Sequence, residues 1–109
     1  MKLLTKEKQM ELPKKVKVGN RWYSVEIVET MQRKAHMGYV YYGTGEIEIA
    51  TKSNVTNKPY SKEEVSDTFW HELTHAILYD MGSSLYKNEK FVTRFANRLS
   101  KAINTAKFK

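Results

Sequence analysis

The spacing of apolar residues changes once along this chain, and that change limits the folds it can adopt. Between Lys15 and Ala50 apolar residues tend to recur at every second position, which is typical of strands. After Ser61 they recur at spacings of three and four residues, which is typical of helices. Strands followed by helices predict an α+β fold. With 109 residues, the chain has room for a single domain, residues 1–109.

Two pairs of strands are expected before the first long helix. Residues 15–18 and 22–28 are rich in β-branched and aromatic residues and flank a Gly-Asn pair, a pattern typical of a β-hairpin. Residues 38–42 and 46–50 have strand composition on either side of Gly-Thr-Gly. We expect a small, mostly antiparallel sheet of three to four strands, with residues 46–50 at its edge. Residues 1–13 are weakly patterned and predict a loosely ordered N-terminal arm.

Two helices are expected after the sheet. Ser61 and Glu64 form a capping box, so a helix should begin there. It should run to about Met81, where Gly82 provides a C-terminal stop. A final helix is indicated by apolar residues at helical spacing, with basic residues on its other side. These apolar residues are Val92, Phe95, Ala96, Leu99 and Ile103.

The composition excludes several kinds of protein. No cysteine is present, which excludes a disulfide scaffold, a cysteine nucleophile and a thiolate metal site. No apolar run approaches the roughly 20 residues that cross a bilayer, and the N-terminus is too polar for a secretory signal. We therefore expect a cytoplasmic protein without membrane contacts. The formal net charge of +7 favours acidic partners, although residues 61–80 carry five carboxylates and one lysine.

The acidic segment contains the sequence HExxH, formed by His71, Glu72 and His75. Residues four apart on a helix share a face, so both imidazoles can reach one metal ion. The glutamate of such a motif acts as general base towards a zinc-bound water, whose pKa falls to about 7. The motif predicts a zinc site with His71 and His75 as ligands and Glu72 as the catalytic residue. Two alternatives stay open: histidines without a metal, and a purely structural zinc site.

The run from Thr68 to Leu78, TFWHELTHAIL, resembles the active-site helix of small zincin-like metallopeptidases of phage and prophage genomes. These are loosely related to the ImmA/IrrE-like and minimal gluzincin families. The resemblance covers about residues 14–103 and continues at Gly82 and at Phe91-Val92 and Phe95-Ala96-Asn97. It implies a zinc-dependent peptidase with one zinc ion per chain and a peptide or protein substrate, in the host cytoplasm if phage-encoded. It also implies a third ligand from the following helix, often glutamate.

A catalytic zinc usually has three protein ligands, and two histidines leave one position to fill. The acids after His75 are Asp80 and Glu89, and no histidine follows. Asp80 lies five residues after His75, about 140° round a helix, and should face away. Glu89 begins the last helix and shares a face with Val92 and Ala96, which should point inward. We therefore expect Glu89 to be the third ligand; the alternative is a carboxylate that only favours the helix dipole.

A residue that stabilises the oxyanion is also expected. The candidates are Tyr86, Tyr60, Tyr39 and His36, and for each of them packing or solvent exposure is the competing explanation. An extended peptide would bind by strand addition along the edge strand, residues 46–50.

Two other functions compete with a peptidase. In the first, the chain is a non-catalytic zinc-binding module that binds a protein regulator or, weakly, nucleic acid. The contacts would come from the basic residues Arg94, Arg98, Lys101 and Lys107, although solubility alone would also explain this basic face. In the second, the chain is a metal-free remnant with a structural role. Zinc content would distinguish the metal-free remnant from the other two functions. Salt-dependent retention on nucleic acid would identify the binding module.

Overall fold

The computed structural model of the protein describes residues 12–32 and 36–108. Within them the chain forms a four-stranded sheet, two α-helices and one short 3₁₀ helix, which confirms the expected α+β fold. Of the arm expected at residues 1–13, residues 1–11 lie outside the described part, and Leu12 packs against the buried core. None of the helices in the described ranges has the length and hydrophobicity required to span a bilayer.

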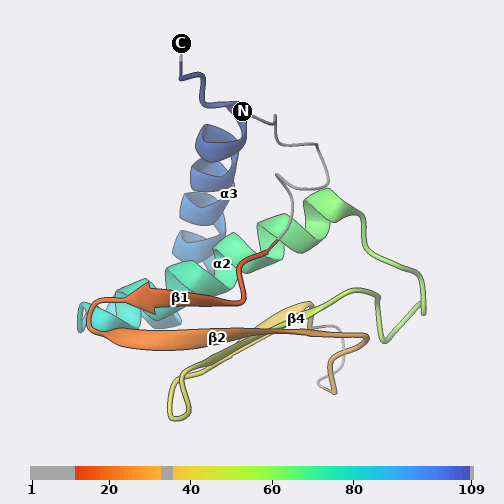
Figure 1. Cartoon of the computed structure of the whole chain (residues 1–109), viewed down its shortest axis with the longest axis horizontal. Helices are drawn as coiled ribbons and strands as arrows, with labels where there is room; N and C mark the ends of the chain where they lie inside the picture. Colours follow the sequence, from red (N-terminus) through yellow and green to blue (C-terminus); the bar gives the residue numbers. More distant parts are fainter. Residues whose placement is uncertain (1–11, 33–35, 109) are drawn as a thin grey trace.

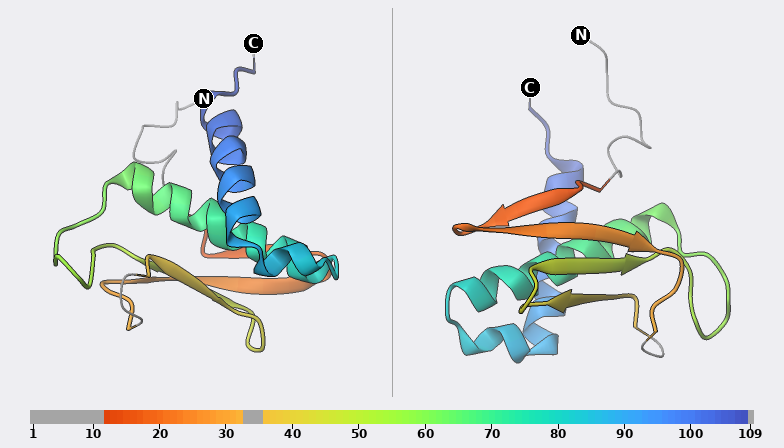
Figure 2. Two further views of the ribbon diagram at one scale, coloured as in Figure 1. Left: turned by 180° about the vertical axis from the view of Figure 1, so that it is seen from behind. Right: turned by 60° about the horizontal axis from the view of Figure 1, so that its bottom comes forward.

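The four strands form one mixed sheet in the order β1-β2-β4-β3 (Figure 2, right). Strands β1 (Lys15–Val18) and β2 (Arg21–Val28) form the expected antiparallel hairpin. Strands β3 (Gly38–Tyr41) and β4 (Glu46–Ala50) form the second antiparallel pair. The two pairs join through β2 and β4, which run parallel. The sheet is therefore mostly antiparallel, as expected, with a parallel pair at its centre.

The prediction that residues 46–50 form the edge strand is wrong. β4 lies between β2 and β3, and the edge strand on this side is β3. After β2 the chain first forms β3 at the edge of the sheet. β4 then occupies the position between β2 and β3. The central position buries Ile47 and Ile49 completely, and this burial of large apolar side chains favours β4 at the centre.

Helix α2 (Lys62–Asp80) packs on the sheet (Figure 1). It begins with the expected capping box: the Ser61 hydroxyl accepts from the Glu64 N–H, and the Glu64 carboxylate accepts from the Ser61 N–H. It ends in a Schellman motif, in which the N–H groups of Gly82 and Ser83 bond carbonyls of the last turn. Gly82 adopts a φ of 72° there, a left-handed conformation that favours glycine.

Helix α3 (Glu89–Thr105) follows a 3₁₀ turn, η1 (Ser84–Lys87), and packs against α2 and η1. Of the five apolar residues expected to face inward, Val92 and Ala96 are buried and Leu99 is half-buried. The other two are about half exposed, Phe95 at 48% and Ile103 at 50%. By helix geometry Phe95 lies at the margin of the face that buries Val92 and Ala96. Ile103 belongs to the last turn of α3, a helix whose C-terminal half extends away from the sheet (Figure 1).

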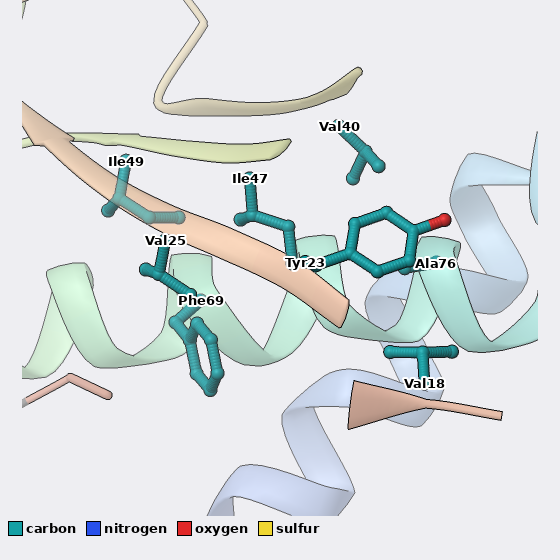
Figure 3. Packing of buried hydrophobic residues seen from close by; sticks show 8 residues of the cluster. All are labelled: Val18, Tyr23, Val25, Val40, Ile47, Ile49, Phe69 and Ala76. Atoms are coloured by element: carbon teal, nitrogen blue, oxygen red, sulfur yellow. The ribbon is translucent and has the colours of Figure 1, made fainter. Parts of the chain in front are cut away.

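The core lies between the sheet and α2 (Figure 3). Alternate strand side chains point towards the helix, because successive residues of a strand face opposite sides of the sheet. This packing fixes the rotation of α2 about its axis and so decides where the side chains of the HExxH motif point. The buried cluster consists of Val18, Tyr23, Val25, Val40, Ile47, Ile49, Phe69 and Ala76.

Candidate metal centre

Helix α2 presents the three side chains of the motif in two directions. His71 and His75 lie one turn apart, with ring centroids 5.0 Å apart, and both meet α3. Glu72 is rotated about 100° from His71 and turns towards β3, where its Cγ lies close to Gly38. His75 and Glu72 are buried, at 7% and 8% exposure, and His71 is half-buried.

Glu89, in the first turn of α3, reaches both histidines. Its Oε1 lies 3.0 Å from His71 Nε2, and its Oε2 lies 2.9 Å from His75 Nε2. The Asn88 side chain caps α3 by accepting from the N–H of Phe91, which fixes where the helix begins and Glu89 projects. Ligand atoms of His71, His75 and Glu89 lie within 4.8 Å of one another, so this group could hold a metal ion. The structure brings together the three ligands expected from the sequence.

The hydrogen bonds of His75 test whether a cation fits this group. Its Nδ1 lies 2.7 Å from the backbone carbonyl of Tyr86, and a carbonyl only accepts, so Nδ1 carries a proton. Neutral His75 then has its lone pair on Nε2, which faces the Glu89 carboxylate at 2.9 Å. Two acceptors at this distance repel each other unless the ring gains a second proton or a cation lies between them. The Tyr86 carbonyl therefore holds the ring in the tautomer that suits metal binding.

His71 is also suited to a metal, because its environment favours the neutral imidazole that coordinates one. Burial lowers the pKa of His71 below its usual value, with Glu89 acting in the opposite direction and His75 adding to the lowering. Tetrahedral zinc, with ligands at about 2.0–2.1 Å, would place its ligand atoms roughly 3.3 Å apart. The two histidine–glutamate distances, 3.0 and 2.9 Å, are slightly shorter and involve different oxygens of Glu89, so this side chain would shift to accommodate the ion.

Glu72 is a buried residue whose carboxylate accepts no hydrogen bond from the part of the chain that the structure describes. Burial raises the pKa of Glu72 to about 8, and the negative charge of Glu89 adds to the effect. No described side-chain oxygen is both fully enclosed and without a hydrogen-bond partner, so the Glu72 carboxylate is open to the cavity. Glu72 lines the same cavity as His71, His75 and Glu89, so its carboxyl group can exchange a proton with a molecule there.

A cavity of about 640 Å³ opens over these residues. Its walls come from β3 and its flanks, from α2, from η1 and from the first residue of α3. Of the residues considered for oxyanion stabilisation, His36, Tyr39 and Tyr86 line the cavity, whereas Tyr60 does not. Tyr60 lies in the loop before α2, where its backbone N–H bonds the carbonyl of Thr51.

Tyr42 also lines the cavity, and the sequence analysis did not single it out. Its ring stacks on Tyr79 at 4.3 Å and meets Tyr86 edge-on at 5.5 Å. Burial raises the pKa of the Tyr42 phenol above its usual value, as does the nearby Glu72, so the phenol stays protonated and able to donate. The alternation of β3 could have indicated Tyr42, because residues two apart share a face and Val40 points towards α2.

Asp80, the other acid considered as a ligand, lies away from the site. Its carboxylate lies beside Gly19 in the turn between β1 and β2. The four basic residues proposed as a partner-binding face, Arg94, Arg98, Lys101 and Lys107, are all exposed.

In comparisons with known proteins, no family model, no curated protein and no solved structure matches this chain. The functional argument therefore depends on the geometry of the site.

Proposed function

We propose that this protein is a zinc-dependent metallopeptidase. The observation that carries the proposal is the convergence of His71, His75 and Glu89 beside the buried, unbonded carboxylate of Glu72. Two imidazoles and a carboxylate are a ligand set typical of catalytic zinc, which keeps three protein ligands and one open position. We propose one zinc ion per chain.

The residues of the site have complementary roles in hydrolysis. A zinc ion held by His71, His75 and Glu89 would supply Lewis acidity and would lower the pKa of a water molecule towards about 7. The positive charge beside Glu72 would favour its ionised form and so oppose the effect of burial on its pKa. Ionised Glu72 accepts a proton from the attacking water and returns it to the departing amine. Tyr39, Tyr42 and Tyr86, all on the cavity wall, are the phenols that we propose as donors to the oxyanion.

We propose that a peptide or protein substrate extends along β3. This strand is at the edge of the sheet, lines the cavity and contacts α2. The outer side of an edge strand has backbone N–H and C=O groups that can pair with another extended chain. Strand addition at β3 would place a scissile bond beside the ligands, and β4, which is paired on both sides, offers no such edge.

Zinc content and the Glu72→Gln variant test the proposal. Wild-type protein offered zinc should bind about one ion per chain by elemental analysis, and His71→Ala or His75→Ala should abolish binding. Glu72→Gln should retain zinc but lose cleavage of unfolded protein substrates, because an amide of equal size cannot accept the proton. Glu26→Gln, an exposed glutamate on the far face of the sheet, is the matched control and should change neither result.

Three results would contradict parts of this proposal. Wild-type protein that takes up no zinc would remove the metal site and favour the metal-free remnant. Loss of zinc from Glu72→Gln would make Glu72 a ligand or a structural residue. Zinc-loaded wild type without cleavage would favour the non-catalytic zinc-binding module.

A further inference from the structure

Helix α3 has a second hollow on its outer side, apart from the cavity at the metal centre. It has a volume of about 500 Å³, and no acidic residue lines it. The lining consists of two phenylalanines, three cationic residues and an amide: Phe91, Phe95, Lys90, Arg94, Arg98 and Asn88.

The two phenylalanines form an apolar strip on the surface. Phe91 and Phe95 lie one helical turn apart and stack with ring centroids 6.0 Å apart and planes at 17°. Phe95 is 48% exposed although phenylalanine is among the residues most often buried. Exposed apolar patches bordered by polar residues are typical of interaction sites.

The three cationic residues run beside this strip without carboxylate partners. Lys90, Arg94 and Arg98 follow at four-residue intervals, which places them about 6 Å apart along the helix axis. None of the three forms an ion pair within the part of the chain that the structure describes. Arg98 donates to the backbone carbonyl of Arg94, which holds its guanidinium along the helix.

We infer that this face of α3 binds an acidic amphipathic helix of a protein partner. Apolar side chains of the partner pack against Phe91 and Phe95, while its carboxylates meet Lys90, Arg94 and Arg98. Carboxylates four residues apart on a helix repeat at the same 6 Å or so as the three cations, so charge and spacing are complementary on this face.

The arrangement of the rings favours a protein partner over single-stranded nucleic acid. Bases bind by stacking on the free faces of aromatic rings. Phe91 and Phe95 lie nearly parallel with ring centroids 6.0 Å apart, so each ring partly occupies one face of the other and less stacking surface is left for bases. The inference goes beyond the proposed peptidase and needs no zinc, since none of the three metal ligands lines this hollow.

Selection of peptides tests the inference. The hollow extends along α3 from Asn88 to Arg98, about 15 Å, which a helical peptide of about 12 residues can cover. A library of random peptides of this length, displayed on yeast, would be selected against the full chain without zinc. We expect enriched peptides to combine Asp or Glu with large apolar residues at helical spacing. The best peptide would then be labelled and its affinity measured by fluorescence anisotropy.

Matched variants of α3 locate the binding site. Arg94→Glu together with Arg98→Glu should weaken binding about tenfold or more, and Phe95→Ser by about tenfold. Two controls lie on the same helix outside the hollow: Lys101, which is exposed, and Ile103, which is half-exposed. Lys101→Glu and Ile103→Ser should each change the affinity less than about twofold. Thermal melting of each variant confirms that it folds.

Several outcomes would overturn the inference. One is selection of peptides without acidic and apolar residues together. Another is equal binding of the selected peptide to wild type and to the doubly charge-reversed variant. Oligothymidine that binds more tightly than the peptide, and loses affinity in the same variants, would make this face a nucleic-acid surface instead.

Discussion

Glu72 retains its proton to higher pH in the folded protein than in the unfolded chain. Its pKa is about 8 in the fold, mainly because of burial, against a usual value of 4.5. A group with a raised pKa contributes its full stability below the unfolded value and loses it as the pH rises through the folded value. For the metal-free protein, the pH window in which this contribution is lost therefore runs from 4.5 to about 8.

We predict that the free energy of unfolding of the metal-free protein falls across this window by a few kcal/mol, on the order of 1.4 kcal/mol per pKa unit. The measurement is urea denaturation at pH 5, 6, 7 and 8 in the presence of a chelator. Glu72→Gln should show a flatter profile, because its side chain does not titrate. His71 acts in the opposite direction: burial lowers its pKa, so its contribution grows as the pH rises towards the usual value of 6.5. Parallel profiles for the two proteins would show that Glu72 is not the source of the decline.

The residues of the site differ in how far the sequence can reveal them. His71, Glu72 and His75 are predictable because helix geometry alone fixes their relative positions. Glu89 is predictable because few acids follow the motif, whereas its distance from the histidines depends on how α3 packs on α2. The Tyr86 carbonyl leaves no trace in the sequence, because every residue has a carbonyl and only the path of η1 directs this one at His75.

At the scale of the elements, the strands were predictable and their order was not. Alternation and turn residues identify the two hairpins, since both signals are local. β4 pairs with β2 and does not lie at the edge, because Ile47 and Ile49 are buried against α2. This is a contact between segments that are distant in the sequence. That difference moves the proposed substrate strand from β4 to β3.

Gly38 determines how closely α2 approaches β3. A Cβ at this position would lie 2.8 Å from Thr68 Cγ2, 3.0 Å from the Glu48 carbonyl oxygen and 3.1 Å from Glu72 Cγ. Gly38→Ala should therefore push α2 away from the strand and destabilise the protein by about 1–3 kcal/mol, as overpacking of a core does. We also expect weaker zinc binding, because the displaced helix carries both histidines. Thermal denaturation and zinc titration would measure the two effects.

Gly43→Ala is the matched control for this substitution. Gly43 is exposed in the turn between β3 and β4, and a Cβ there would meet nothing within 4 Å. Its stability should stay within about 1 kcal/mol of wild type, because a compatible Gly→Ala change acts mainly on the unfolded chain. A Gly38→Ala protein as stable as this control would mean that α2 does not depend on the close approach.

At the scale of the molecule, the proposed metal centre would connect the two helices. α2 belongs to the packed core, whereas α3 packs only against α2 and η1 within the described residues. The ligands divide in the same way, with His71 and His75 on α2 and Glu89 on α3. A metal held by all three would therefore fasten the outer helix to the core. Such a link would matter in a small domain, because a chain of 109 residues can form only a modest core.

We predict that chelation lowers the melting temperature and that Glu89 determines the size of the shift. A metal that binds only the folded state stabilises it by about 4 kcal/mol at a thousandfold excess over Kd. Small domains shift by about 4–8 °C per kcal/mol, so the change should be easily measured by calorimetry with and without EDTA. Glu89→Gln should shrink the shift strongly, because a neutral amide is a poorer zinc ligand.

Asp80→Asn is the control: the Asp80 carboxylate lies beside Gly19, so the variant should show the wild-type shift whatever its own baseline stability. A large shift in Glu89→Gln and a small one in Asp80→Asn would reassign the third ligand and leave the pair of histidines in place.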